Sequence, residues 1–157
     1  MGKSLRILDS DILSYALYDE SPAHDCSWRV VERGLLGEID LHVTHTTILE
    51  AYNVLFWFYR VRPLTSLLEK LALTVGGLKI VEVSTRGLEI SAADNIPLGD
   101  GFLMATALKH SIPIIVTNDS HIIGKAERYG LLTENPVPED VREKLSDWKI
   151  EENNPES

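Results

Sequence analysis

Short apolar runs alternate with segments of helical periodicity along the first 45 residues. Residues 5–8 (LRIL) lack helical spacing and predict a buried parallel strand. Asp11 precedes ILSYAL and is the predicted N-cap of a helix over residues 12–17. Residues 21–37 carry apolar side chains at helical spacing, whereas residues 41–45 (LHVTH) alternate as a strand does. The chain is therefore expected to open as strand, helix, helix, strand.

The same alternation continues through the rest of the chain. Periodicity and stop signals predict helices over residues 46–60, 63–75, 85–95, 99–110, 120–129 and 137–148. Apolar and β-branched runs predict strands over residues 78–83, 113–117 and 131–134. The helix over residues 46–60 is apolar on nearly every side, so we expect it to lie centrally in the core. Alternating strands and helices indicate an α/β fold with a parallel sheet.

Length and composition favour one soluble domain. A chain of 157 residues, 44% hydrophobic and 25% charged, suits a single domain over residues 1–148. Residues 149–157 are polar and acidic and are expected to form a disordered tail. No apolar stretch reaches the roughly 18 residues of a membrane-spanning helix, and the N-terminus lacks a signal-peptide core. With Cys26 as the single cysteine, an intrachain disulfide is impossible, and we expect a cytoplasmic protein without a membrane partner.

The net charge argues against general attraction to nucleic acid. Lysine and arginine number 15 against 24 acidic residues, which gives a formal charge of −9. A polynucleotide, whose binding depends on phosphate contacts, would therefore have to be held locally. Arg60 and Arg62 are the local basic candidates, and Trp57, Phe58 and Tyr59 beside them have rings that can stack on bases. Alternatively, the aromatic residues belong to the core and the arginines form a solvated helix end.

Four acidic residues, each beside a different apolar run, indicate a site. Asp9 and Asp119 follow predicted strands, Asp100 begins a helix, and Glu50 lies early in the helix after the second strand. In an open parallel sheet, ligands bind beyond the carboxyl ends of the strands, so all four belong to the same rim. Converging carboxylates repel one another unless a hard divalent cation neutralises them. The pattern therefore predicts a metal-dependent phosphodiester hydrolase.

Each acidic residue also has a simpler structural explanation. Asp9 alone suits a turn or cap, Asp100 a first-turn carboxylate interacting with the helix dipole, and Asp119 an N-cap. Glu50 lies among apolar neighbours, where it needs either a metal ion or a lysine or arginine as partner. The set of four is thus more specific than any one member, and Glu50 is its sharpest test.

The four acidic segments together resemble the PIN domain family, which includes the VapC-type toxin ribonucleases. The matching residues are Asp9 in LDSDIL, Glu50 in TTILEAYNVL, Asp100 in GDGFLMATAL and Asp119 in VTNDSHI, in the family's order and across residues 5–132. The resemblance implies a three-layer α/β/α domain with a central parallel sheet of four to five strands. It also implies a metal site at the four acidic positions, with Thr117 supplying a hydroxyl nearby, and endonuclease cleavage of RNA. If the chain is a toxin, the resemblance further implies an antitoxin partner and a homodimer.

Two positions near the site have open interpretations. Where many relatives have Asp-Thr-Asn, this chain has Asp9-Ser10-Asp11, and Asp11 is either an additional acidic group or the helix cap. Many relatives also have Asp-Ala at the third acidic position, where this chain has Asp100-Gly101. His121 follows Asp119 closely enough to approach the site, although a residue at the start of a helix is the simpler interpretation.

Oxygen ligands at one rim select Mg²⁺ or Mn²⁺ over zinc. Asp9, Glu50 and Asp100 are the expected metal ligands, and Asp119 binds either a second ion or a metal-bound water. Two other functions are compatible with the sequence. A haloacid dehalogenase-type phosphatase would use Asp9 as a nucleophile in an Asp-x-Asp turn, and a PIN-like module would bind RNA or protein without cutting it.

Overall fold

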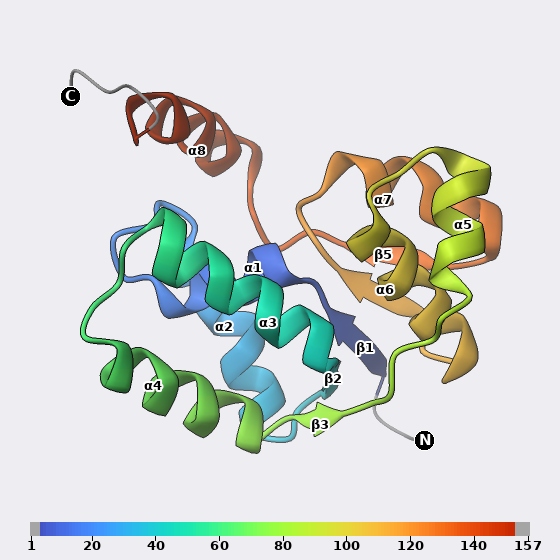
Figure 1. Ribbon diagram of the computed structural model, residues 1–157, viewed down its shortest axis with the longest axis horizontal. Helices are drawn as coiled ribbons and strands as arrows, with labels where there is room; N and C mark the ends of the chain where they lie inside the picture. The colour runs from blue at the N-terminus through green and yellow to red at the C-terminus, as the bar shows by residue number, and fades with distance from the viewer. Residues whose placement is uncertain (1–3, 153–157) are drawn as a thin grey trace.

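The computed structural model describes residues 4–152 and contains a sheet of five parallel strands (Figure 1). The strand order is β3-β2-β1-β4-β5, so β1 is central and the direction of winding reverses between β1 and β4. Ile7 in β1 is aligned with His42 on one side and Ile115 on the other. The strands are β1 (Leu5–Leu8), β2 (Asp40–Val43), β3 (Lys79–Ile80), β4 (Ile114–Val116) and β5 (Leu132–Glu134).

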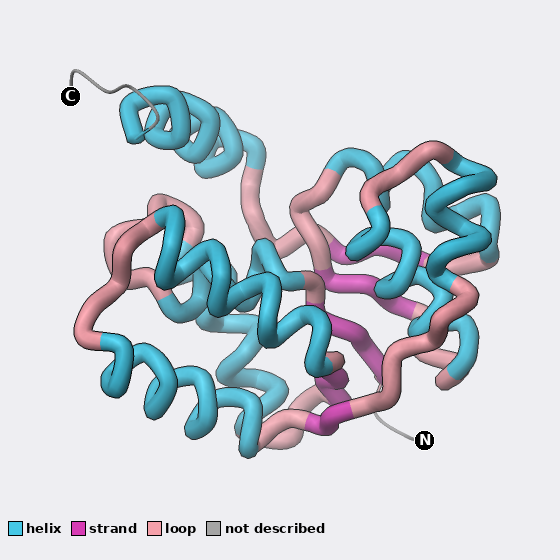
Figure 2. Tube along the Cα trace, viewed as in Figure 1, coloured by secondary structure: helices cyan, strands magenta, loops and turns pink. Residues whose placement is uncertain are grey.

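Helices connect successive strands, as the periodicity predicts (Figure 2). Helix α3 continues into a π-helical turn, η1 (Val54–Phe58), and α7 continues into a 3₁₀ turn, η2 (Ala126–Tyr129). None of the helices in the described part of the chain has both the length and the apolar character needed to cross a membrane. The α-helices are α1 (Ser10–Leu17), α2 (His24–Leu35), α3 (His45–Asn53), α4 (Leu64–Gly76), α5 (Gly87–Asp94), α6 (Leu98–Lys109), α7 (Ser120–Lys125) and α8 (Glu139–Glu152).

The central strands divide the interior into two cores. Successive side chains of a strand point to opposite faces of a sheet. Leu8 and Val116 accordingly pack into a core with residues of α1, α2, α3, α4 and α8, whereas Ile7 and Ile115 pack with residues of α5, α6 and α7. Helices therefore cover both faces of the parallel sheet, which confirms the predicted three-layer α/β/α fold.

The N-cap predicted for the first helix is wrong by two residues. Asp9, with extended backbone angles, is the N-cap of α1, and its carboxylate accepts a hydrogen bond from the Ser10 amide at 2.7 Å. The chain turns directly from β1 into the helix, which leaves Asp9 as the last extended residue. Asp11 consequently lies in the first helical turn, where its carboxylate accepts from backbone amides instead of capping the helix.

The predicted central position of the helix over residues 46–60 is also wrong. Thr47, Ala51 and Leu55 are buried at intervals of four, so α3 and η1 contribute one stripe to the core. Leu49 and Trp57 are 59% and 67% exposed. The apolar composition of this helix is therefore not evidence of burial on all sides.

Two predicted boundaries differ from the structure. Strand β3 is limited to two exposed residues at the edge of the sheet, shorter than the predicted 78–83. Short edge strands limit unwanted pairing with other chains. Helix α8 runs to Glu152, four residues past the predicted domain boundary, and residues 153–157 of the predicted tail lie outside the described residues.

Candidate metal centre

The predicted acidic residues converge at the carboxyl edge of the sheet, beside the point where the winding reverses. Asp9 follows β1, and Asp119 follows the neighbouring strand β4 as the N-cap of α7. Asp100 is buried in the first turn of α6, and Glu50 lies in α3 after β2. The pKa of Asp100 responds to the charges of Asp119, Asp9 and Glu50, which shows that the four carboxylates share one electrostatic environment.

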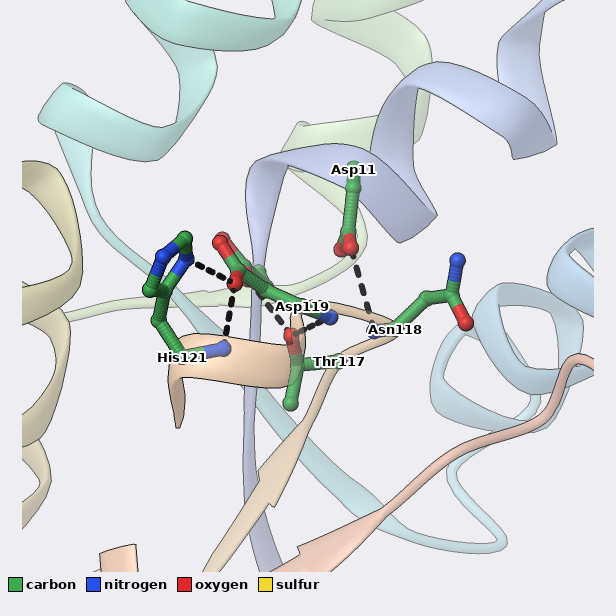
Figure 3. A network of polar contacts seen from close by, with 6 residues as sticks. Asp11, Thr117, Asn118, Asp119 and His121 are labelled. Atoms are coloured by element: carbon green, nitrogen blue, oxygen red, sulfur yellow. Dashed lines mark hydrogen bonds and ion pairs between the residues drawn. The ribbon is translucent and has the colours of Figure 1, made fainter. Parts of the chain in front are cut away.

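Thr117 links the ends of the two central strands. Its buried Oγ1 donates a hydrogen bond to Asp9 Oδ2 at 2.7 Å and accepts one from the Asp119 amide at 2.9 Å. Figure 3 shows this hydroxyl beside Asp119. Thr117 therefore does more than end a strand, because its hydroxyl fixes Asp9 and the start of the Asp119 loop relative to each other.

Asp11 adds a fifth carboxylate to this edge of the sheet. Its Oδ1 accepts from the Ile12 amide at 2.7 Å, and its Oδ2 accepts from the Asn118 amide at 3.0 Å, a contact drawn in Figure 3. The Asn118 side chain in turn accepts from Asn135 Nδ2 at 2.9 Å. The sequence offers Asp11 only as an alternative site residue and does not single out Asn118. The Asp-x-Asp spacing was the available signal for Asp11.

Burial and mutual repulsion disfavour the charged forms of these carboxyl groups. Burial, followed by the charges of Asp119 and Asp9, raises the pKa of Asp100 to about 8. Burial and then the charge of Asp9 raise the pKa of Glu50 to about 7. Burial also raises the pKa of Asp9 to about 6 against the opposing hydrogen bond from Thr117, and it raises the pKa of Asp11 well above its ordinary value. A cation at this rim would offset the repulsion.

Glu50 lies half-buried at the rim and not within the apolar core that its neighbours in sequence suggest. A Cβ atom added to Gly99, at the start of α6, would lie 2.5 Å from Glu50 Oε2. Glycine at this position therefore allows α6 to approach the carboxylate closely. No lysine or arginine within residues 4–148 forms an ion pair with Glu50, which removes the salt-bridge explanation for the side chains that the structure describes.

The side chains present fit a divalent cation. Asp100 Oδ2 is buried and has no hydrogen-bond partner among the described residues, although buried carboxylate oxygens are normally satisfied. Asp100, Asp119 and His121 each place one ligand atom within 4.8 Å of the other two. Carboxylate-rich sites suit Mg²⁺ and Mn²⁺. Asp100, which carries this oxygen, thus belongs to a group of side chains suited to such an ion.

The structure does not bring the predicted substrate arginines to the carboxylates. Arg60 is exposed and lies beyond η1, ten residues after Glu50. Arg62 Nη1 donates to the carbonyls of Phe56 and Val61 at 2.7 and 2.9 Å, and its guanidinium lies 3.6 Å from the centre of the Phe56 ring. Of the aromatic residues beside them, Tyr59 is buried, whereas Trp57 and Phe58 are exposed.

The three-layer fold and the carboxylates gathered beside its switch point define an α/β protein with a candidate acidic site. The chain belongs to the PIN domain family, whose sequence profile matches residues 6–128. This match confirms the resemblance carried by the four acidic segments. PIN domains are typically nucleases.

Two solved structures share the fold. PAE2754 from Pyrobaculum aerophilum is 18% identical, with a TM-score of 0.56 over 95% of this chain and 99% of that one. VapBC2 from Rickettsia felis, bound to a DNA fragment from their promoter, is 17% identical, with a TM-score of 0.58 over 83% of this chain and 97% of that one. A search of the curated proteins gives no match. At these identities, the two structures establish a common architecture.

Proposed function

We propose that the protein is an endoribonuclease that uses Mg²⁺ or Mn²⁺ to hydrolyse phosphodiester bonds in RNA. The observation that carries the proposal is the buried Asp100 Oδ2, which has no hydrogen-bond partner among the described residues and lies within a group of carboxylates whose pKa values are raised. Membership in the PIN domain family supports nuclease chemistry at this site. The same membership argues against the haloacid dehalogenase-type phosphatase.

Asp9, Glu50, Asp100 and Asp119 are the proposed metal ligands. A bound ion would polarise a phosphoryl oxygen and lower the pKa of an attacking water. Thr117 holds Asp9 Oδ2 in place through its 2.7 Å hydrogen bond, so its contribution is to position a ligand. The carboxylates must lose their protons to bind the ion, and cleavage should therefore weaken in acid.

Substrate binding must overcome the net charge of −9. We propose that Arg60 and Arg62 contact phosphates distant from the cleaved bond and do not contact the scissile phosphate. Exposed apolar residues on the neighbouring elements α3, η1 and α4 support a homodimer, because large exposed apolar side chains can form an interaction site where they are contiguous. These residues are Leu49, Trp57, Phe58, Leu64, Leu68 and Leu73.

The architecture shared with VapBC2 supports a role as the toxin of a toxin-antitoxin pair. An antitoxin would then be expected to cover the acidic rim in the cytoplasm. A small protein encoded beside this one would be coexpressed with it. Copurification of the two proteins, with loss of RNA cleavage in the complex, would test this part of the proposal.

The decisive experiment is incubation with mixed cellular RNA and Mg²⁺ or Mn²⁺, followed by analysis of the fragment ends. We expect 5′-phosphate fragments that disappear in chelator and in the Asp9→Asn and Asp100→Asn variants. Cleavage by these variants at the wild-type rate would refute the assignment. RNA binding without cleavage under every metal condition would instead identify a non-catalytic module.

A further inference from the structure

An imidazole lies beside two of the proposed metal ligands. His121 Nδ1 is 3.0 Å from Asp119 Oδ1, and the His121 amide donates to the same oxygen at 2.8 Å (Figure 3). This double contact holds the ring next to the carboxylate. The hydrogen bond from the His121 amide would by itself be enough to begin α7, so the ring contact is additional.

Asp100 supplies an independent sign that this group takes a ligand. Its side chain comes from a different helix, is 8% exposed, and has an Oδ2 atom without a hydrogen-bond partner among the described residues. One ligand atom each from Asp100, Asp119 and His121 lies within 4.8 Å of the other two. Metal–ligand distances of about 2.0–2.3 Å require ligand atoms within about 4.6 Å of one another. Small side-chain adjustments therefore suffice to close the set around one ion.

We propose that His121, with Asp100 and Asp119, forms a mixed nitrogen and oxygen site that selects Mn²⁺ over Mg²⁺. This inference rests on the proposed metal-dependent function and specifies its cation. An imidazole nitrogen adds more to the affinity of a first-row transition ion such as Mn²⁺ than to that of Mg²⁺, which is bound almost entirely by oxygen. Mn²⁺ also accepts carboxylate ligands readily, so it suits the two aspartates as well as the imidazole.

The selection follows from what each ion gains at the same three side chains. Mg²⁺ would bind the two carboxylates and complete its shell with water, so His121 contributes little to its affinity. Mn²⁺ would gain a nitrogen ligand. Removing the imidazole should therefore lower the affinity for Mn²⁺ selectively.

The test measures ion binding directly on the full chain. Wild type and His121→Asn are titrated with MnCl₂ and MgCl₂ by calorimetry, and Mn²⁺ samples are examined by pulsed electron paramagnetic resonance for imidazole nitrogen. We expect wild type to bind Mn²⁺ at least tenfold more tightly than Mg²⁺. His121→Asn should lose about tenfold in Mn²⁺ affinity and the nitrogen signal, with Mg²⁺ affinity changed by less than about twofold.

Two further variants sharpen the measurement. His121→Asp replaces nitrogen by oxygen and should favour Mg²⁺ relative to His121→Asn. His110→Asn is the matched control, because His110 caps the opposite end of α6 from Asp100, and it should retain the nitrogen signal. Thermal unfolding in chelator checks that each variant is folded.

The outcomes separate this inference from the proposed function. Persistence of the nitrogen signal in His121→Asn, or a parallel fall in both affinities, overturns the role of His121 and leaves a metal-dependent nuclease intact. Failure of the folded wild type to bind either ion overturns the metal centre and this inference together.

Discussion

Replacing Asp100 by asparagine should stabilise the metal-free protein while abolishing its function. The pKa of Asp100 is raised from 3.8 to about 8, chiefly by burial and then by the neighbouring carboxylates. A group with a raised folded-state pKa contributes stability that is complete below pH 3.8 and is lost as the pH rises towards 8. At pH 8 the unscreened loss would be about 5 kcal/mol. Asparagine resembles the neutral acid and avoids this loss.

The effective dielectric constant of protein sites, about 20 even where they are buried, reduces that figure to about 1–2 kcal/mol. For a chain of this length, we expect Asp100→Asn to raise the Tm in chelator at pH 8 by about 3–6 °C. The gain should shrink as the pH is lowered and become small near pH 4, where folded Asp100 is protonated and the unfolded-state carboxyl is close to half protonated. Saturating Mn²⁺ or Mg²⁺ should raise the Tm of wild type more than that of the variant.

Differential scanning calorimetry between pH 4 and pH 8, with and without metal, measures these shifts. Asp147→Asn is the matched control, because it removes an exposed carboxylate on α8, and it should show no such pH-dependent gain. An unchanged or lower Tm for Asp100→Asn in chelator at pH 8 would refute the electrostatic reasoning. An equal gain at pH 4 and pH 8 would refute it as well.

Three further predictions concern the neighbours of the carboxylates. Thr117→Val should cost about 1 kcal/mol of stability and weaken metal binding measured by calorimetry, whereas Thr117→Ser retains the hydroxyl; equal metal affinity in both variants would contradict the positioning of Asp9. Gly99→Ala should displace Glu50 and lower the cleavage rate at least tenfold in an RNA assay, whereas Gly124→Ala, whose Cβ would meet open space, should cleave at the wild-type rate. Because the pKa values of Asp9 and Glu50 are raised to about 6 and about 7, metal-supported cleavage should rise between pH 5 and pH 8; a flat profile would argue against proton displacement.

The fold was largely predictable because its signals are local. The buried strands after Ser4 and Pro113 are short apolar runs, and α6 is bounded by Pro97 at its start. Strand–helix alternation then restricts the sheet to parallel connections. The burial of α3 was not predictable in this way. Its apolar residues exceed what one stripe can bury, and only tertiary packing decides which of them face solvent.

The convergence of the acidic residues was predictable for a topological reason, since strand ends in a parallel sheet meet at one edge. The contacts among these residues were not predictable from the sequence. The bond from Thr117 to Asp9 spans 108 residues, and the close approach of Gly99 to Glu50 depends on how α6 meets α3. The cap of α1 was misassigned because Asp9 and Asp11 both suit an N-cap, and the exact end of β1 decides between them.

The division of the interior by β1 has a mechanical consequence for the acidic rim. Glu50 comes from a helix packed on the same side of the sheet as Leu8, whereas Asp100 comes from a helix packed on the same side as Ile7. An ion held by both carboxylates would link the two helical layers across the edge of the sheet. Its binding energy would then resist opening of either helical layer, and hydrogen exchange should slow in α3 and α6 together when metal is added.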